Sequence, residues 1–211
     1  MEKELKKTLA LIHLAEKLKQ ELRHSWLSNG RQESVAEHSW RVSLMVILLE
    51  PFLSRKINLA KALKISVIHD LVEVEAKDIP AFEHHRQKEK KKNEKSAMEK
   101  IKDILSSEKG EELSRLWLEY ENQTSYEAKY VRALDKLEVR LQHNEANMNT
   151  WNEIEFPRSL FVADKHCKFE KYLKELNDLI KDESRIKIKK AGIDLNKVER
   201  KARKLAVDIK D

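Results

Sequence analysis

Apolar residues recur every three or four positions along most of the chain, which is the spacing of one face of an α-helix. The first run of this kind consists of Leu5, Leu9, Ile12 and Leu18. Residues that force turns are scarce, since the 211 residues include only three glycines and three prolines. So few turn signals leave little room for a β-sheet fold. The pattern predicts an all-α protein, and the length is enough for a sizeable buried core.

Breaks in the spacing and capping residues predict where the first helices begin and end. We expect the first helix to end near Arg23 and a loop to cover residues 25–32. Ser34 or Glu33 can cap the second helix, because their side-chain oxygens can accept a hydrogen bond from a free backbone N–H. Asn58 is placed to cap the third. That third helix is so apolar that we expect it to be central and buried.

The same spacing continues toward the C-terminus. Lys109-Gly110 is expected to form a turn between two helices. Further helical stripes are expected over Met98–Leu105, Leu113–Tyr120, Val131–Leu141 and Leu173–Ile180, with a short last helix after Asp194. No repeat, low-complexity linker or composition break is visible. We therefore expect one helical bundle over residues 1–211, with the core motifs in about 20–150 and the C-terminal helices in 165–211.

Charge and cysteine content exclude some classes of protein. The 43 basic residues exceed the 37 acidic ones only modestly and are interleaved with them, so we expect no polymeric nucleic acid as a partner. The single cysteine, Cys167, cannot form an internal disulfide, which favours a reducing compartment. The polar N-terminus lacks a signal peptide's apolar core, and no apolar run approaches the roughly 20 residues of a membrane span. A soluble, cytoplasmic protein without a membrane partner is expected.

The segment His69-Asp70-Leu71-Val72-Glu73 lies in the most apolar predicted helix. Burying a charge without a partner is costly, so the three ionisable residues in this five-residue segment need partners that offset this cost. Adjacent residues diverge by about 100° around a helix, which lets His69 and Asp70 approach one metal ion from neighbouring directions. Glu73 lies on the same side. The alternative is a core histidine beside an aspartate with a local contact.

Two further positions can contribute metal ligands. His38 lies in the first turn of the second helix, and Asp135 interrupts an apolar stripe between Leu134 and Leu137. Asp135 can also be read as a surface residue at the edge of that stripe. Together with His69 and Asp70 these residues supply two imidazoles and two carboxylates. Such a set suits Mn, Co, Fe, Zn or Mg, and a six-coordinate ion would keep positions open for water and substrate, as catalytic sites do.

The order of these motifs resembles the HD-domain family of phosphohydrolases. More narrowly, Arg31–His38, His69–Glu73 and Asp78–Pro80 are similar to the YfbR-like 5′-deoxynucleotidases. Leu116–Glu121 and the Asp135-Lys136 pair resemble the branch that contains HD domain-containing protein 2. The similarity covers roughly residues 5 to 150. It implies hydrolysis of deoxyribonucleoside 5′-monophosphates to deoxynucleoside and phosphate.

The resemblance also implies roles for individual residues. His38, His69, Asp70 and Asp135 match the metal ligands, and Glu73 matches the catalytic carboxylate. Asp78 matches a second active-site acid, which either protonates the leaving sugar oxygen or holds the sugar. Basic residues near the phosphate are implied at Arg23 and Arg31. Relatives often form homodimers, and the apolar stripes here permit one.

The loop from Arg23 to Arg31 departs from the family pattern, because it is shorter and reads Arg23-His24-Ser25-Trp26. Its aromatic residue, Trp26, can stack on a base or ribose or simply pack. A second departure is the Ala76-Lys77 pair before Asp78, where relatives commonly have a glycine. Substrate preference is therefore open. An HD phosphohydrolase acting on another nucleotide or phosphomonoester is the second hypothesis, and a non-catalytic helical binding module is the third.

Two clusters outside these motifs are interpreted as surface features. His84-His85 is read as a pair in a solvated loop rather than a second metal site. The run Lys88–Lys92 is read as the solvent-exposed face of a helix, which could also steer anionic substrates.

Overall fold

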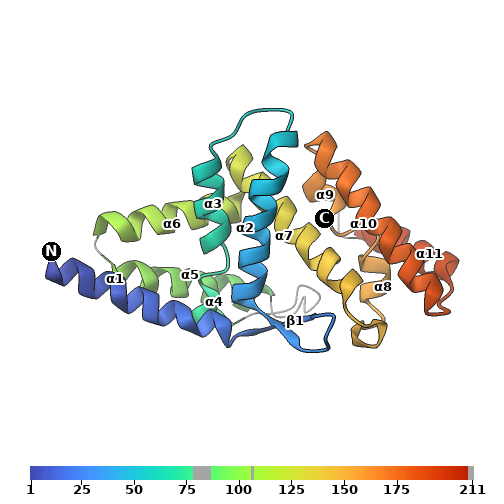
Figure 1. The fold of residues 1–211 in the computed structure, drawn as a ribbon, viewed down its shortest axis with the longest axis horizontal. Helices are drawn as coiled ribbons and strands as arrows, with labels where there is room; N and C mark the ends of the chain where they lie inside the picture. Colours follow the sequence, from blue (N-terminus) through green and yellow to red (C-terminus); the bar gives the residue numbers. More distant parts are fainter. Residues whose placement is uncertain (78–86, 106, 209–211) are drawn as a thin grey trace. The chain divides into compact units, whose positions relative to one another are not determined.

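The computed structural model describes residues 1–77, 87–105 and 107–208, and these form two compact, mainly helical units (Figure 1). Unit 1 consists of Met1–His24, Gln32–Glu50 and Ile57–Val131, and unit 2 of Ser25–Arg31, Pro51–Lys56 and the chain from Arg132 onward. The predicted all-α class is confirmed. A single domain over residues 1–211 stays a prediction.

Unit 1 contains most of the N-terminal helices and a small sheet. Its elements are α1 (Glu2–Ala15), η1 (Glu16–Lys19), β1 (Leu22–Trp26), β2 (Gln32–Ser34), α2 (Val35–Leu49), α3 (Leu59–Ile68), α4 (Glu73–Ala76), α5 (Gln87–Ile104), α6 (Ser107–Asn122) and the start of α7 (Tyr126–Glu145). The last two residues of β1 and the part of α7 after Val131 belong to unit 2. The 3₁₀ turn η2 (Glu50–Phe52) lies at the boundary.

Helix pairs α2–α3, α5–α6 and α1–α5 pack side by side in unit 1. The core cluster of this unit is apolar and comes from several elements: Leu18, Val35, Leu71, Val72, Val74, Ala76, Ala97, Met98, Ile101 and Trp117. Helix α2 begins with a capping box, in which Ser34 Oγ accepts from the Glu37 N–H and the Glu37 carboxylate accepts from the Ser34 N–H. Ser34 is thus the cap that the sequence allowed, and it fixes the start of the helix that carries His38.

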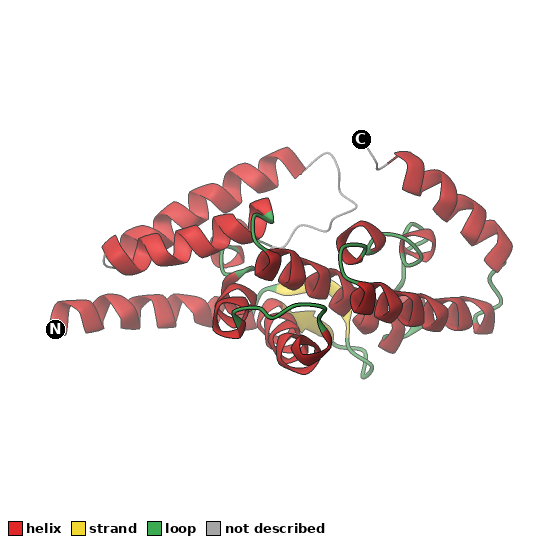
Figure 2. Cartoon of the chain, turned by 90° about the horizontal axis from the view of Figure 1, so that it is seen from above, coloured by secondary structure: helices red, strands yellow, loops and turns green. Residues whose placement is uncertain are grey.

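The prediction that the first helix ends near Arg23 is wrong. Helix α1 ends at Ala15, η1 follows, and Arg23 lies in strand β1, which pairs with β2 (yellow in Figure 2). Burial alternates along β1, with Arg23 and Ser25 inside. This period of two is a strand pattern made of polar residues, so a search for apolar periodicity does not detect it. The expected loop is correspondingly shorter and turns at Gly30, whose φ is 87°.

The motif His69–Glu73 does not lie within a continuous helix, contrary to expectation. Helix α3 is capped by Asn58 as predicted but ends at Ile68, and α4 begins at Glu73. Between them the backbone bonds span three residues, from Leu71 N to Ile68 O and from Glu73 N to Asp70 O. These are tighter than the four-residue bonds of an α-helix. The ionisable residues therefore sit at a helix junction.

Two other expectations for unit 1 are corrected. Helix α3 is buried on one side only, since Val67 on its other side is 58% exposed. Lys109-Gly110 forms no turn but lies inside α6. There Gly110 packs so closely against α5 that an added Cβ would lie 2.6 Å from the Lys102 carbonyl oxygen. The glycine is thus needed for close helix packing rather than for a change of chain direction.

Unit 2 is built from the end of α7 and the C-terminal helices. Its further elements are η4 (Met148–Thr150), α8 (Glu155–Arg158), α9 (Asp164–Cys167), α10 (Lys171–Lys190) and α11 (Leu195–Asp208). Leu160, Ile188, Val198 and Ala202 form an apolar cluster that is part of its core. Among the described residues no helix is both long and apolar enough to cross a membrane.

Candidate metal and catalytic site

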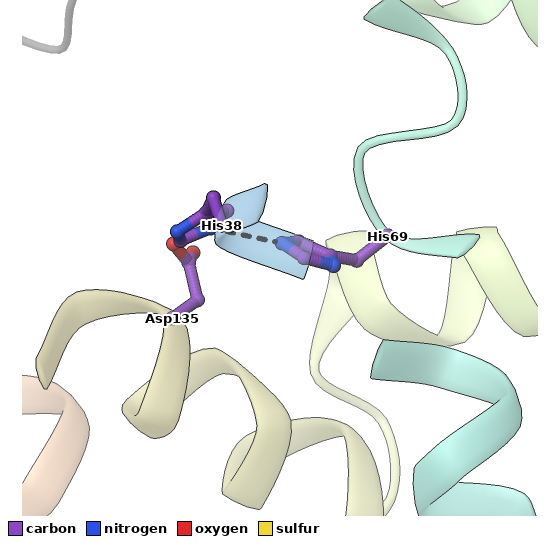
Figure 3. A group of neighbouring side chains, drawn as sticks. All are labelled: His38, His69 and Asp135. Carbon is purple, nitrogen blue, oxygen red and sulfur yellow. Dashed lines mark hydrogen bonds between the residues drawn. The ribbon is translucent and has the colours of Figure 1, made fainter. Parts of the chain in front are cut away.

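Three predicted metal ligands of unit 1 come together in space. His38 Nε2 lies 3.3 Å from His69 Nε2, and Asp70 Oδ2 lies 3.6 Å and 3.3 Å from these two nitrogens. Both histidines are buried. Figure 3 shows the two rings with the bond between them. Helix α2 presents His38, and the α3–α4 junction presents His69 and Asp70.

The spacing of these donors fits one divalent cation. Two ligand atoms at about 2.1 Å from an ion lie roughly 3.0 to 3.6 Å apart at angles of about 90° to 120°. The His69 ring is also oriented for this purpose, since its Nδ1 lies 2.8 Å from the Ser66 carbonyl oxygen. A proton on Nδ1 that is donated to this carbonyl leaves the Nε2 lone pair directed toward the other ligands. Two imidazole nitrogens and a carboxylate oxygen match the ions expected from the sequence.

Asp70 is held in its charged form. Burial by itself would raise the pKa of this carboxyl, but His69, Arg23 and His38 outweigh it and bring the pKa far below its usual range. Arg23 Nη1 donates to Asp70 Oδ2 at 3.1 Å, and its Nε lies 3.4 Å from Glu33 Oε2. A charged carboxylate at neutral pH is the form that binds a metal.

Asp135, the fourth predicted ligand, lies on the part of α7 that belongs to unit 2 and is 5% exposed. Within unit 2 its Oδ2 lies 3.0 Å from Lys136 Nζ and 3.9 Å from Arg132 Nη1. Burial excludes the alternative that Asp135 is an exposed residue at the edge of an apolar stripe. Its role as a ligand stays a prediction.

Glu73, the predicted catalytic carboxylate, is the first residue of α4 and is 3% exposed. Lys90 Nζ of α5 lies 3.6 Å from Glu73 Oε1 and 3.5 Å from Glu94 Oε1. Burial raises the pKa of Glu94, and this carboxyl therefore holds a proton more readily than an exposed glutamate.

The sequence interpretation missed the contact of Lys90 with Glu73, because it assigned Lys90 to the exposed face of a lysine-rich helix. Its side chain is only 21% exposed. A signal was present in the spacing, since Lys90, Glu94, Ala97 and Ile101 follow one another at intervals of four, three and four. Glu94, Ala97 and Ile101 are buried, so this is the inward face of α5.

The predicted substrate-binding residues have different environments. Arg23 is 9% exposed and bonded to Asp70, as described above. Trp26 ends strand β1, and its carbonyl oxygen accepts from Gln142 Nε2 at 2.7 Å. Arg31 is exposed at the end of the hairpin turn. Asp78 lies outside the described residues, as does the pair His84-His85. The substrate roles of Arg23, Trp26 and Arg31 stay predictions.

Comparisons with known proteins agree on one family. The profile of the HD domain matches residues 15–177. The chain is 34% identical to the 5′-deoxynucleotidase HDDC2 of Xenopus laevis over 139 residues. This aligned stretch covers 65% of this chain and 68% of the relative. The human 5′-deoxynucleotidase HDDC2 is 32% identical over the same length, 65% of this chain and 67% of the relative.

Solved structures include a similar fold. The crystal structure of a protein from Magnetospirillum magnetotacticum, described as a predicted metal-dependent phosphohydrolase, matches with a TM-score of 0.75 and 27% identity. The match covers 86% of this chain and 95% of that one.

Proposed function

Because this chain belongs to the HD domain family, we propose that it is a metal-dependent 5′-deoxynucleotidase that hydrolyses deoxyribonucleoside 5′-monophosphates to deoxynucleoside and phosphate. The observation that carries the proposal is the convergence of His38 Nε2, His69 Nε2 and Asp70 Oδ2 within 3.6 Å. Relatives with more than 30% identity carry the name 5′-deoxynucleotidase. A metal ion held by these three donors, with the Glu73 carboxylate three residues after Asp70, suits hydrolysis better than a purely structural role.

We propose that Asp135 completes the ligand set with His38, His69 and Asp70. Helix α7 is unbroken from Tyr126 to Glu145, and Asp135 follows the buried Val131 by four residues on the same face. Two neutral imidazoles and two carboxylates would balance the charge of one divalent cation. Mn, Co, Mg, Fe and Zn all accept nitrogen and oxygen ligands of this kind.

A bound divalent cation would supply Lewis acidity, which lowers the pKa of water and polarises a phosphoryl oxygen. Glu73 would orient the attacking water and take its proton. Lys90 Nζ, 3.6 Å from Glu73 Oε1, would hold this carboxylate in place. Arg23 would keep Asp70 ionised through the bond at 3.1 Å.

The small nucleotide substrate would be held by residues near the hairpin. Arg31 is exposed and can offer two parallel hydrogen bonds to a phosphate. We propose that Arg31 contacts the phosphate and that Trp26 packs on the base or ribose. Arg23 would contribute positive charge while remaining bonded to Asp70. Asp78 would act on the leaving sugar oxygen or hold the sugar.

Phosphate release from a panel of deoxyribo- and ribonucleoside 5′-monophosphates with Mn²⁺, Co²⁺ or Mg²⁺ tests the proposal. We expect release from the deoxy substrates, a loss of about 10²-fold or more in Glu73→Gln, and little change in the matched exposed variant Glu153→Gln. Equal rates on ribo and deoxy substrates would contradict the sugar preference. Release only from other phosphomonoesters would favour the second hypothesis, an HD phosphohydrolase with another substrate. No release from any phosphomonoester would contradict both.

We also propose that the chain forms a homodimer. Trp40, Leu44 and Ile47 follow a helical spacing along α2 and are 66%, 38% and 49% exposed. A stripe of large apolar side chains on a surface is typical of a protein interface. Analytical ultracentrifugation would test this: a dimer is expected for the wild type and a monomer for Trp40→Glu. A monomeric wild type at micromolar concentration would contradict the proposal.

A further inference from the structure

Glu94 on α5 is a buried acid to which the proposed hydrolysis assigns no role. Its residue exposure is 9%. The core residues Ala97 and Ile101 follow it at intervals of three and four, so its side chain leaves α5 on the inward face. Glutamate is almost never buried without a partner, because taking its charged form out of water is costly. An apolar side chain at this position would avoid that cost.

The neighbours of Glu94 are themselves charged. Burial raises the pKa of its carboxyl, the charge of Lys90 opposes this shift, and the charges of Glu121 and Asp70 add to it. Glu94 is therefore close enough to the carboxylate of Asp70 for the two charges to act on each other. Packing alone does not account for an acid in these surroundings.

Lys90 connects Glu94 to Glu73. Its Nζ lies 3.5 Å from Glu94 Oε1 on the same helix and 3.6 Å from Glu73 Oε1 on α4. Helix α4 packs against α5 (Figure 1), and both belong to unit 1. Side-chain exposures of 3%, 21% and 11% for Glu73, Lys90 and Glu94 show that all three groups are largely out of water. Solvent and salt therefore screen these contacts less than they screen a surface ion pair.

Support of the helix is a weak explanation for the contact between Lys90 and Glu94. The two residues are four apart on α5, which is the spacing of an ordinary pair on a helix surface. Here the lysine precedes the glutamate, and this order stabilises a helix less than the reverse. The lysine side chain has a flexible four-carbon stem and three donors. An anchor at Glu94 restricts the positions that the ammonium can take beside Glu73.

We propose that Glu94 is a positioning residue for Glu73 and acts through Lys90. Glu94 would hold the Lys90 ammonium, and the ammonium would hold one oxygen of Glu73, so that this carboxylate keeps one orientation toward the attacking water. The inference rests on the proposed function, which gives Glu73 its part in the reaction. Glu94 would then contribute to turnover without contacting the substrate.

Steady-state kinetics on a deoxyribonucleoside 5′-monophosphate with saturating Mn²⁺ tests the inference. Lys90→Met removes the bridge, Lys90→Arg keeps its charge, and Glu94→Gln keeps the shape of the anchor without its charge. The matched controls are Lys95→Met and Glu99→Gln, which change exposed residues of the same helix. Circular dichroism and the amount of bound Mn²⁺ are measured for each variant.

We expect kcat to fall about 10- to 100-fold in Lys90→Met and about tenfold in Glu94→Gln, because misplaced catalytic groups lose turnover on this scale. KM and bound Mn²⁺ should stay at the wild-type level, and the two controls should match the wild type. Lys90→Arg should recover part of the turnover that Lys90→Met loses.

A double-mutant cycle gives a readout that needs no activity. Thermal unfolding in EDTA compares Lys90→Met with Glu73→Gln and with Glu94→Gln, each alone and combined. In both cycles the losses in Tm should be less than additive, because the substituted groups share one contact.

Three results would overturn this inference and leave the proposed function standing. One is a wild type that releases phosphate while Lys90→Met and Glu94→Gln turn over like the controls. Another is a raised KM with an unchanged kcat in Lys90→Met, since Lys90 would then contact the substrate. The last is a pair of cycles in which the losses in Tm simply add. A wild type that releases no phosphate would contradict the proposed function and this inference together.

Discussion

Replacing Arg23 with methionine tests whether this arginine organises the metal site. Methionine keeps much of the apolar stem but removes the charge. In the wild type the guanidinium lies 3.1 Å from Asp70 Oδ2 and 3.4 Å from Glu33 Oε2. Side-chain exposures of 11%, 18% and 2% for Arg23, Asp70 and Glu33 show that all three charges are largely removed from water. The variant would leave two carboxylates without their common cation.

The magnitude follows from these distances. At an effective dielectric constant of about 20, each contact has a Coulomb energy of about 5 kcal/mol, much of which offsets the desolvation of the three groups. Removing one partner of a buried pair costs about 3–5 kcal/mol. The two histidines remain beside Asp70 and reduce this cost, so we expect Arg23→Met to lose about 3 kcal/mol of stability. For a chain of this length, that is roughly 6–12 °C in Tm.

Thermal unfolding in EDTA is the appropriate assay, with the exposed Arg200→Met on α11 as a matched control. The control should stay within about 0.5 kcal/mol of the wild type. Added Mn²⁺ should stabilise Arg23→Met at least as much as the wild type, because the ion would neutralise Asp70 in place of the arginine. An Arg23→Met variant as stable as the control in EDTA would refute the reasoning, since Arg23 would then have no organising role.

Two substitutions and one labelling experiment test the packing of the fold. Gly110→Ala should lower the free energy of unfolding by about 1–3 kcal/mol, because the new Cβ would lie 2.6 Å from the Lys102 oxygen; a stabilised variant in urea unfolding would contradict this close packing. Tyr130→Phe should cost about 1 kcal/mol through loss of the 3.1 Å bond to the Val46 oxygen, and an unchanged urea midpoint would argue against it. Burial raises the pKa of the Cys167 thiol to about 12, so Ellman's reagent should react with it at pH 8 only after unfolding; rapid labelling of the native protein would contradict the buried position.

The sequence predicted the features that depend on apolar spacing and on capping. The helical class and the caps at Ser34 and Asn58 were confirmed. His38, His69 and Asp70 lie side by side, and their role as metal ligands stays a prediction. Strand β1 was missed because its buried residues, Arg23 and Ser25, are polar. Their burial depends on partners distant in the sequence, such as Asp70, and no local pattern reports such partners.

The helix break after Ile68 and the position of Lys90 were missed for a similar reason. The helix break after Ile68 contains no glycine or proline, so composition gave no signal for it. Lys90 belongs to a lysine-rich segment. The spacing placed it on the inward face of α5, but its contact with Glu73 Oε1 at 3.6 Å is a tertiary one that the local sequence does not indicate. Tertiary contacts, rather than local propensity, decided both features.

We propose that one divalent cation held by His38, His69, Asp70 and Asp135 is required for phosphate ester hydrolysis. The most direct test measures bound metal and phosphate release in the same samples while EDTA-treated protein is titrated with Mn²⁺ or Co²⁺. Activity on a deoxyribonucleoside 5′-monophosphate should rise in proportion to bound metal and level off near one ion per chain, and His69→Ala should lose both tight binding and activity. Full hydrolysis by metal-free protein, or by a His69→Ala variant that binds no metal, would contradict the account.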